Sequence, residues 1–358
     1  MSRYLLVDIG AGTMDILCYD DTSDLHYKAV VKSPVQTVAE TAARLPGNLV
    51  VTGCEMGGGP VSSVLRQRAK SAKVAMTGAA AATLHHDPER VEAWGIRIVT
   101  ETEAIELQGR NDYQSLRLGD VNPERLERII SGLGIPFEFD VAAFCAQDHG
   151  VAPRGVSHLD FRHQLFTSYL ENQPTPERLL FQKNEIPTTM NRLRSIAADA
   201  ARLPAGEIFV MDSGMAAILG ASMDRLCQGS PSFIILDIAT SHTVGAALAN
   251  GEIASFFEYH TRDVTPERLD ELIRDLAEGK LSHGSVLAEG GHGAYTRRAI
   301  GFDPNGIILA TGPRRRLIAN STLPMKFGAP WGDNMMTGTV GLLEAVRRQK
   351  SLSPLTYL

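Results

Sequence analysis

The chain has 358 residues, of which 44% are hydrophobic and 21% are charged. This composition can bury an ordinary core and excludes wholesale disorder, and at roughly 150 residues per domain the length predicts about two domains. The net charge of -6 gives no overall attraction to phosphate backbones or anionic lipid, so we expect neither a nucleic-acid nor a membrane-surface role.

The first segments of the chain predict an antiparallel meander followed by alternating helices and strands. Residues 4–9, 14–19 and 25–31 are short β-rich runs, and Gly10-Ala11-Gly12 separates the first two. Helical and strand patterns then alternate as far as residue 100. A meander continued by alternating elements predicts a mixed α/β sheet.

Four short segments share a Pro-Glu-Arg signature that is typical of helix starts. They are residues 87–90, 122–125, 175–178 and 265–268. Each offers a capping oxygen, a proline at the first helical position and an acid in the first turn. We interpret them as four independent helix caps and not as a repeat.

The second half of the chain repeats the opening pattern. Residues 109–204 are less regular and leave room for an inserted subdomain. Strand patterns at 232–238, 244–249 and 252–257 then form a second predicted meander, in which Asp237 ends an apolar strand as Asp8 does. This recurrence predicts a duplication at the scale of a domain.

The turn after the first strand reads Asp-Ile-Gly-Ala-Gly-Thr-Met-Asp at residues 8–15. It lacks the third glycine of a dinucleotide-binding motif, and a β-type run follows it, so a Rossmann site is excluded. Residues 278–282 carry Leu where a P-loop needs a hydroxyl. A glycine-containing hairpin turn remains, which can direct backbone N–H groups at a phosphate while a strand-end carboxylate positions hydrated Mg²⁺.

Five segments resemble motifs of the actin-like ATPase superfamily, which includes sugar kinases and the seventy-kilodalton heat-shock chaperones. In the superfamily's order they are the first phosphate loop (8–15), the first connector (210–218), the second phosphate loop (237–243), the adenosine-binding turn (306–313) and the second connector (332–341). The resemblance implies an α/β protein with two ribonuclease-H-like domains and a nucleotide cleft between them. The first domain would comprise residues 1–206 plus 333–358, with an inserted subdomain within 109–204, and the second residues 207–332.

The resemblance also implies roles for individual residues. Asp8 and Asp237 would hold the Mg²⁺ of Mg-ATP across the cleft. The other implied nucleotide contacts are Gly10, Ala11, Gly12 and Thr13 on one side, Thr240, Ser241, His242 and Thr243 on the other, and Thr311 and Gly312 at the adenosine. Alternatively, Thr311 would only end a strand and not contact a nucleotide. Asp212 is the candidate base, and a helix N-cap is an equal alternative for it.

The second phosphate loop departs from the superfamily because Ala239, Thr240 and Ser241 replace its typical glycines. A non-glycine residue in the left-handed conformation costs roughly 1–2 kcal/mol, so we expect an altered backbone here. Either the hydroxyls and His242 bind phosphate, or the γ-phosphate contacts are lost.

Two further loops are candidates for substrate binding. Gly57, Gly58 and Gly59 would permit close approach of a ligand, or would form a tight turn with positive φ. Asp148 and His149 are candidate catalytic residues, with Arg162 as an anion anchor, and an ordinary polar loop is an equal alternative.

Together these features predict a cytoplasmic Mg-ATP-dependent phosphotransferase or ATPase that acts on a small molecule. The alternatives are an ATP-driven activator or chaperone of a partner enzyme, and a binding module without turnover; a homodimer stays open. Some proteins of this type are labelled as related to pyruvate formate-lyase activation. The four cysteines, Cys18, Cys54, Cys145 and Cys227, are scattered and supply no C-x-x-x-C-x-x-C motif, so we expect no such radical chemistry.

Overall fold

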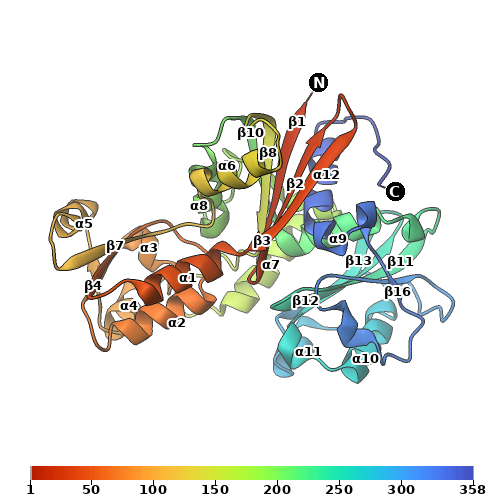
Figure 1. The fold of residues 1–358 in the computed structure, drawn as a ribbon. Helices are drawn as coiled ribbons and strands as arrows, with labels where there is room; N and C mark the ends of the chain where they lie inside the picture. The colour runs from red at the N-terminus through yellow and green to blue at the C-terminus, as the bar shows by residue number, and fades with distance from the viewer. Residues whose placement is uncertain (1, 358) are drawn as a thin grey trace.

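A computed structural model describes residues 2–357, which form three β-sheets with helices between and around them (Figure 1). The first sheet has the strand order β3-β2-β1-β8-β10-β9. Its strands are β1 (Arg3–Ile9), β2 (Thr13–Asp20), β3 (Leu25–Lys32), β8 (Phe139–Ala146), β9 (Leu180–Gln182) and β10 (Ala205–Asp212). The strands β1 to β3 are antiparallel, and β8 and β10 continue the sheet in parallel with β1.

The second sheet repeats this arrangement in the order β14-β13-β12-β11-β15-β16. Its strands are β11 (Ser232–Ile238), β12 (His242–Ala249), β13 (Glu252–His260), β14 (Gly293–Thr296), β15 (Ile308–Thr311) and β16 (Lys326–Phe327). Three antiparallel strands again precede parallel strands on the far side of the first one. This topology confirms the predicted fold class of two ribonuclease-H-like units.

A third sheet, β6-β5-β4-β7, is entirely parallel and separate from the first. Its strands are β4 (Asn48–Gly53), β5 (Val74–Thr77), β6 (Ile96–Val99) and β7 (Tyr113–Leu118), and its helices are α1 (Pro34–Arg44), α2 (Gly59–Arg68), α3 (Gly78–Ala81), α4 (Pro88–Ala93) and α5 (Glu101–Gln108). The prediction that these strands continue the first sheet is wrong. Parallel strands covered by helices close a core of their own, here around residues such as Leu49, Leu65 and Met76.

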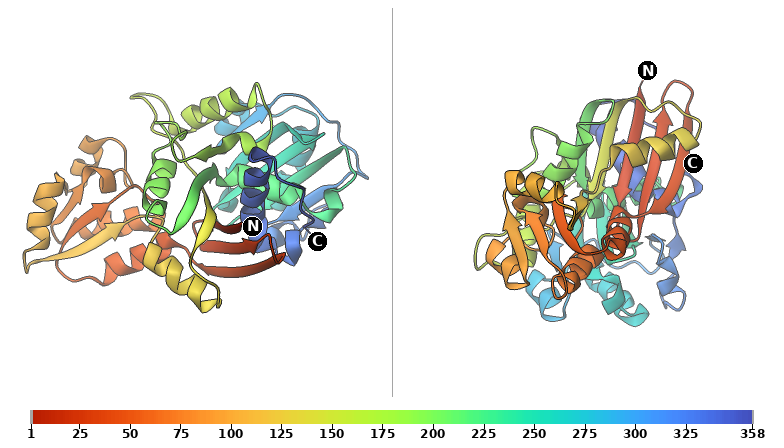
Figure 2. Two further views of the ribbon diagram at one scale, coloured as in Figure 1. Left: turned by 90° about the horizontal axis from the view of Figure 1, so that it is seen from above. Right: turned by 60° about the vertical axis from the view of Figure 1, so that its left-hand side comes forward.

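The third sheet extends to one side of the first sheet, opposite the second sheet (Figures 1 and 2). It is inserted in the chain between β3 and β8. The range 109–204, in which we predicted a subdomain, contributes β7 to the third sheet and β8 and β9 to the first sheet. The predicted domain boundary at 206/207 falls inside β10, which pairs with β8 along its length; the division of the chain into domains stays a prediction.

Seven further α-helices follow in the chain, and three of the four predicted helix starts are confirmed. The helices are α6 (Pro123–Gly132), α7 (His158–Leu170), α8 (Asn191–Ala200), α9 (Ser213–Ser222), α10 (Pro266–Ala277), α11 (His283–Ala288) and α12 (Thr337–Gln349). Three of the four Pro-Glu-Arg segments begin α-helices with a side-chain cap. The fourth forms only the 3-10 turn Pro176–Leu179, where Thr175 makes no capping hydrogen bond.

The two predicted connectors form helices α9 and α12, which cross at very short distance. A Cβ on Gly220 of α9 would overlap the carbonyl oxygen of Thr337, and one on Gly341 of α12 would overlap that of Ala216. Helix α12 also packs against β1 and β8, so the C-terminal connector returns to the first sheet as predicted. No helix within residues 2–357 is long and apolar enough to span a membrane.

Candidate functional site

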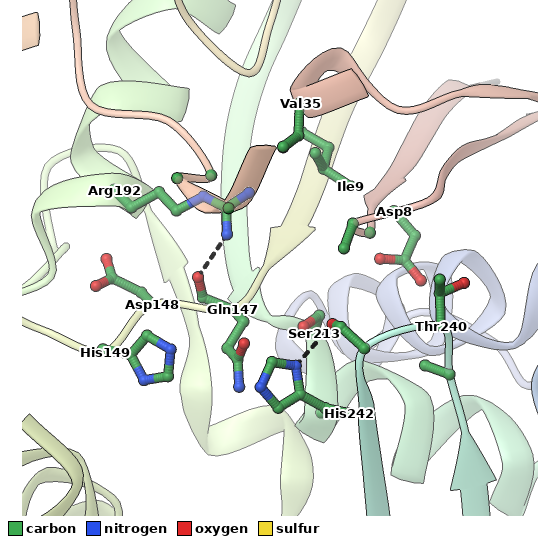
Figure 3. A pocket seen from close by; sticks show the side chains of 18 of the residues that line it. Asp8, Ile9, Val35, Gln147, Asp148, His149, Arg192, Ser213, Thr240 and His242 are labelled. Atoms are coloured by element: carbon green, nitrogen blue, oxygen red, sulfur yellow. Dashed lines mark hydrogen bonds between the residues drawn. The ribbon is translucent and has the colours of Figure 1, made fainter. Parts of the chain in front are cut away.

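A cavity of about 840 Å³ lies between the β1–β2 turn, the β11–β12 turn and the loops after β4 and β8 (Figure 3). It brings together most of the residues predicted for the site. Those that line it are Asp8, Gly10, Ala11, Thr13, Gly57, Gly58, Gly59, Asp148, His149, Arg162, Asp237, Thr240, Ser241, His242 and Gly312. Four predicted residues are not among its lining residues, namely Gly12, Asp212, Thr243 and Thr311.

The two hairpin turns have the same closing hydrogen bond. The N–H of Gly10 donates to the carbonyl of Thr13 at 3.0 Å, and the N–H of Ala239 donates to that of His242 at 3.0 Å. No residue of either turn has a positive φ. Neither turn therefore uses the left-handed conformation that would require glycine, and an altered backbone relative to the superfamily stays a prediction.

Close approach of the two turns explains a glycine in the first one. A Cβ on Gly12 would lie 3.0 Å from both Cγ2 and Oγ1 of Thr240. The first turn therefore faces the second one at close distance, and Figure 3 shows Asp8 and Thr240 on the two facing segments.

Three aspartates gather at these turns, of which Asp15 is buried and Asp8 and Asp237 are half-buried. Burial and the charge of Asp8 raise the pKa of Asp237 to about 7, and burial followed by Asp8 raises that of Asp15 to about 8. Burial is also the main cause that raises the pKa of Asp8, to about 6. The neighbouring charges that shift Asp15 and Asp237 are all carboxylates, and Asp15 Oδ1 has no hydrogen-bond partner within residues 2–357. This cluster fits a hydrated Mg²⁺ ion, which takes one or two carboxylates and keeps several waters.

The N-terminus of α12 approaches the same cluster. A Cβ on Gly338 would overlap the carboxylate of Asp8, so the glycine lets the first turn of the helix pass next to it. A helix N-terminus stabilises negative charge. The second connector thus supplies a favourable field to the aspartate that ends β1.

Asp212 is held away from the cavity by structural contacts. Its Oδ1 accepts hydrogen bonds from the N–H groups of Gly214 and Met215, and its Oδ2 accepts one from Arg162 Nη1 at 2.9 Å. The alternative role of Asp212 as an N-cap of α9 is confirmed. A role as catalytic base stays a prediction that these contacts do not favour.

Arg162 connects the two walls of the cavity. Besides Asp212, its guanidinium reaches Glu258 Oε2 of β13 at 3.3 Å and donates to the backbone oxygen of Asp148 at 2.6 Å. The side chain is buried, and two carboxylates already neutralise it. It is therefore poorly placed to anchor a substrate anion, in contrast to its predicted role.

Asp148 and His149 have different environments. The carboxylate of Asp148 accepts the N–H of Gly150 at 2.8 Å and that of Leu193, in the first turn of α8, at 3.0 Å. Burial lowers the pKa of His149 to about 3, and its Nδ1 is buried without a partner within residues 2–357. Asp148 is thus a structural anchor, while His149 presents a neutral imidazole to the cavity (Figure 3).

Close contacts and backbone conformation explain why residues 57–59 are glycines. A Cβ on Gly57 would lie 2.6 Å from Val35 Cγ2, one on Gly58 would lie 2.8 Å from the carbonyl oxygen of Thr83, and Gly59 has a φ of +40°. These contacts and the positive φ support the tight-turn alternative. Substrate binding by this loop stays a prediction.

Sequence reasoning missed the polar side chains around this loop. Glu55 lies 3.0 Å from His86 Nε2, and Arg192 donates to Asp120 and to the Gln147 carbonyl oxygen, both at 2.8 Å. All three cavity residues, Glu55, His86 and Arg192, line the wall opposite the second turn. Their partners are distant in sequence, so only the adjacency of Glu55 to the glycines could have indicated them.

Two threonines predicted to contact the nucleotide are buried in pairs. Thr243 Oγ1 lies 3.0 Å from that of Thr261, and Thr311 Oγ1 lies 2.7 Å from that of Thr337. Thr311 ends β15, as its alternative role required. Gly312, with a φ of +88°, does line the cavity and passes close to Asp237.

The two sheets and the cavity between their turns define an actin-like ATPase fold. The family model described as "Putative pyruvate format-lyase activating enzyme (DUF1786)" matches residues 56–317, and the chain belongs to that family. No curated protein matches its sequence. All four cysteines are free, and burial raises the pKa of each of them.

Solved structures of similar fold cover nearly the whole chain at low identity. The ethanolamine utilization protein EutJ from Carboxydothermus hydrogenoformans has 10% identity and a TM-score of 0.34, covering 95% of this chain and 88% of its own. The ROK hexokinase from Thermus thermophilus has 12% identity and a TM-score of 0.32 (98% and 99% covered). The activator of 2-hydroxyisocaproyl-CoA dehydratase from Clostridium difficile, with bound ADPNP, has 11% identity and a TM-score of 0.31 (99% of both). The fold assignment therefore depends on the sheet topology.

Proposed function

We propose that this protein binds Mg-ATP in the cavity and acts as an ATP-dependent phosphotransferase or ATPase. The observation that carries the proposal is the pair Asp8 and Asp237, which end equivalent strands of the two sheets and line one cavity. The negative charge of Asp8 raises the pKa of Asp237, and a cation between the two carboxylates would relieve this repulsion. The acceptor, a small molecule or a partner enzyme, remains a prediction.

The chain's own groups would position the phosphates. Asp8 and Asp237 would hold Mg²⁺ through water, and the ion would neutralise phosphate charge. The backbone N–H groups of residues 11–12 and 240–241 make no backbone hydrogen bond within residues 2–357 and lie at the tips of the two turns. They can therefore donate to phosphate oxygens, as N–H groups of tight turns do.

A nucleotide-binding module without turnover is the second candidate. Asp212 and Asp148 both use their carboxylates to accept backbone hydrogen bonds, which leaves neither predicted base free. Phosphate release in the presence of Mg-ATP distinguishes an ATPase from the module. Release above that of an Asp8→Ala control would support hydrolysis, and equal release would leave the module or a phosphotransferase, which passes its phosphate to an acceptor.

Thermal unfolding with and without Mg-ATP tests the proposed binding. At a ligand concentration about 100 times the Kd, binding should stabilise the protein by about 2.7 kcal/mol. Asp237→Asn should lose this response, whereas Asp112→Asn, an exposed aspartate paired with Arg110, should keep it. Because the variant removes a half-buried charge, its unliganded form should unfold no earlier than wild type. An unchanged response in Asp237→Asn, or no response in wild type, would refute the proposal.

A further inference from the structure

Three histidines meet at one edge of the second sheet. His242 begins β12, His260 ends β13 directly opposite it, and His292 immediately precedes β14. One ring nitrogen from each lies within 4.8 Å of those of the other two. Neighbouring antiparallel strands bring these residues together, although they are far apart in the sequence.

The cluster has unsatisfied nitrogen atoms. His242 Nε2 and His292 Nδ1 are buried and have no hydrogen-bond partner within residues 2–357, and the side chain of His292 is only 7% exposed. Buried polar atoms normally have partners, and an imidazole nitrogen without a hydrogen-bond partner is free to bind a metal.

A neighbouring side chain orients the ring of His242. Ser241 Oγ lies 2.8 Å from His242 Nδ1, which leaves Nε2 of that ring for the cluster. Metal-binding histidines usually have such a hydrogen-bonding group on the nitrogen that faces away from the metal. Glu258 Oε1, at 3.6 Å from His292 Nδ1, is too distant for a hydrogen bond and leaves that nitrogen unpaired within residues 2–357.

Two glycines fix the position of His292. Gly293 has a φ of +130°, and a Cβ on it would overlap the ring of His283. A Cβ on Gly291 would lie 2.7 Å from the ring of Tyr259. Both glycines of the Gly-Gly-His-Gly segment that flank His292 are therefore needed for close packing, which holds the His292 imidazole against the end of β13.

We propose that His242, His260 and His292 bind one divalent transition-metal ion of the zinc class, with a fourth coordination position open to the cavity. Ligand nitrogens at 2.0–2.1 Å from a tetrahedral ion are about 3.4 Å apart, so small ring rotations would close the cluster on the metal. Three nitrogen ligands favour zinc-class ions over Mg²⁺, which prefers oxygen. The site is separate from the aspartate cluster and does not depend on nucleotide binding.

The open position faces His149 of the other wall. The ring centroid of His149 lies 6.0 Å from that of His292 and 6.4 Å from that of His242, and all three line the cavity. A water or an anionic substrate oxygen on the metal would lie next to His149, whose Nδ1 is unpaired within residues 2–357. Catalytic zinc sites share this combination of three protein ligands and one exchangeable position.

Cobalt binding to untagged, chelator-stripped protein tests the proposal. Wild type should bind one equivalent of Co²⁺ with the visible absorption bands of a cobalt ion bound by nitrogen ligands, and Zn²⁺ should displace it. His292→Ala and His260→Ala should lose these bands. Ser241→Ala should weaken binding about 10- to 100-fold, as expected for loss of a group that orients a ligand. His26→Ala, which removes a histidine stacked on Trp331 outside the cavity, should bind as wild type does.

A second set of outcomes separates this site from the aspartates. Asp237→Asn should keep the cobalt bands although it loses the Mg-ATP response. Loss of the bands in Asp237→Asn together with their retention in His292→Ala would assign the ion to the carboxylates and overturn the proposal. The absence of these bands in wild type would also overturn it, whatever the folding of the variants, which circular dichroism would monitor.

Discussion

The β1–β2 turn and the β11–β12 turn have the same closing backbone hydrogen bond but present different side chains. Both close with the same hydrogen bond, and both follow an aspartate at the end of a strand. In the first turn Asp15 pairs with Asp8 across the strands, whereas in the second Val244 takes that position opposite Asp237. Sheet register thus sets the conformation of the turn, and the side chains that it presents are free to differ between the two halves.

The largest expected effect comes from breaking the crossing of α9 and α12, which holds the two turns face to face. Gly341→Ala would place a methyl group on the carbonyl of Ala216. We expect the free energy of unfolding to fall by about 3 kcal/mol or more, because overpacking against backbone cannot be relieved by a rotamer change. Urea denaturation measures this loss.

Gly132 at the end of α6 is the matched control, since a Cβ there meets nothing within 4 Å. Gly132→Ala should leave stability unchanged or raise it by up to about 1 kcal/mol. Equal stability of the two alanine variants would contradict the close crossing of the connectors.

The contact between the turns can be tested by a double-mutant cycle. Gly12→Ala introduces a Cβ 3.0 Å from two atoms of Thr240, and we expect a loss of about 1–2 kcal/mol in the free energy of unfolding. Thr240→Ala removes both atoms, so the double variant should recover most of the loss. Additive effects of the two substitutions would show that the turns do not touch in solution.

The sequence predicted the backbone of the site well and its side-chain partners poorly. Strand periodicity and the turn at residues 8–15 located both aspartates that end the strands. The third sheet was missed because alternating helices and strands do not specify which sheet a strand joins. The role of Arg162 was not foreseen because its pairing with Asp212, 2.9 Å apart in space, joins segments 50 residues apart. The three-histidine cluster has no sequence signal, since it depends on the register of three strands.

Glycine substitution tests whether the second turn is strained. Ala239 does not have a positive φ, so Ala239→Gly should destabilise the protein by roughly 0.5–1 kcal/mol through chain entropy. Asn250, in the β12–β13 turn, has a φ of 54°, and Asn250→Gly should be neutral or slightly stabilising. A gain in stability from Ala239→Gly, measured by the same denaturation experiment, would show that the second turn is strained.

The smallest expected effect concerns two adjacent histidines on the wall opposite the second turn. The hydrogen bond with Glu55 raises the pKa of His86, whereas burial lowers that of His85, whose Nδ1 accepts the N–H of Asp87 at 2.8 Å. The contribution of His86 to stability should therefore be complete below its unfolded pKa of about 6.5 and be lost as the pH rises through the higher folded value. That of His85 should be lost as the pH falls below about 6.5.

Denaturation of His86→Gln and His85→Gln between about pH 5.5 and 8 measures these contributions as differences from wild type. The difference for His86→Gln should shrink with rising pH and that for His85→Gln should grow, each by less than about 1 kcal/mol, since both side chains are partly exposed. A difference for His86→Gln that grows with rising pH would mean that Glu55 does not favour the protonated form of His86. The two adjacent histidines would then respond to pH in the same direction, and the contact with Glu55 would not distinguish them.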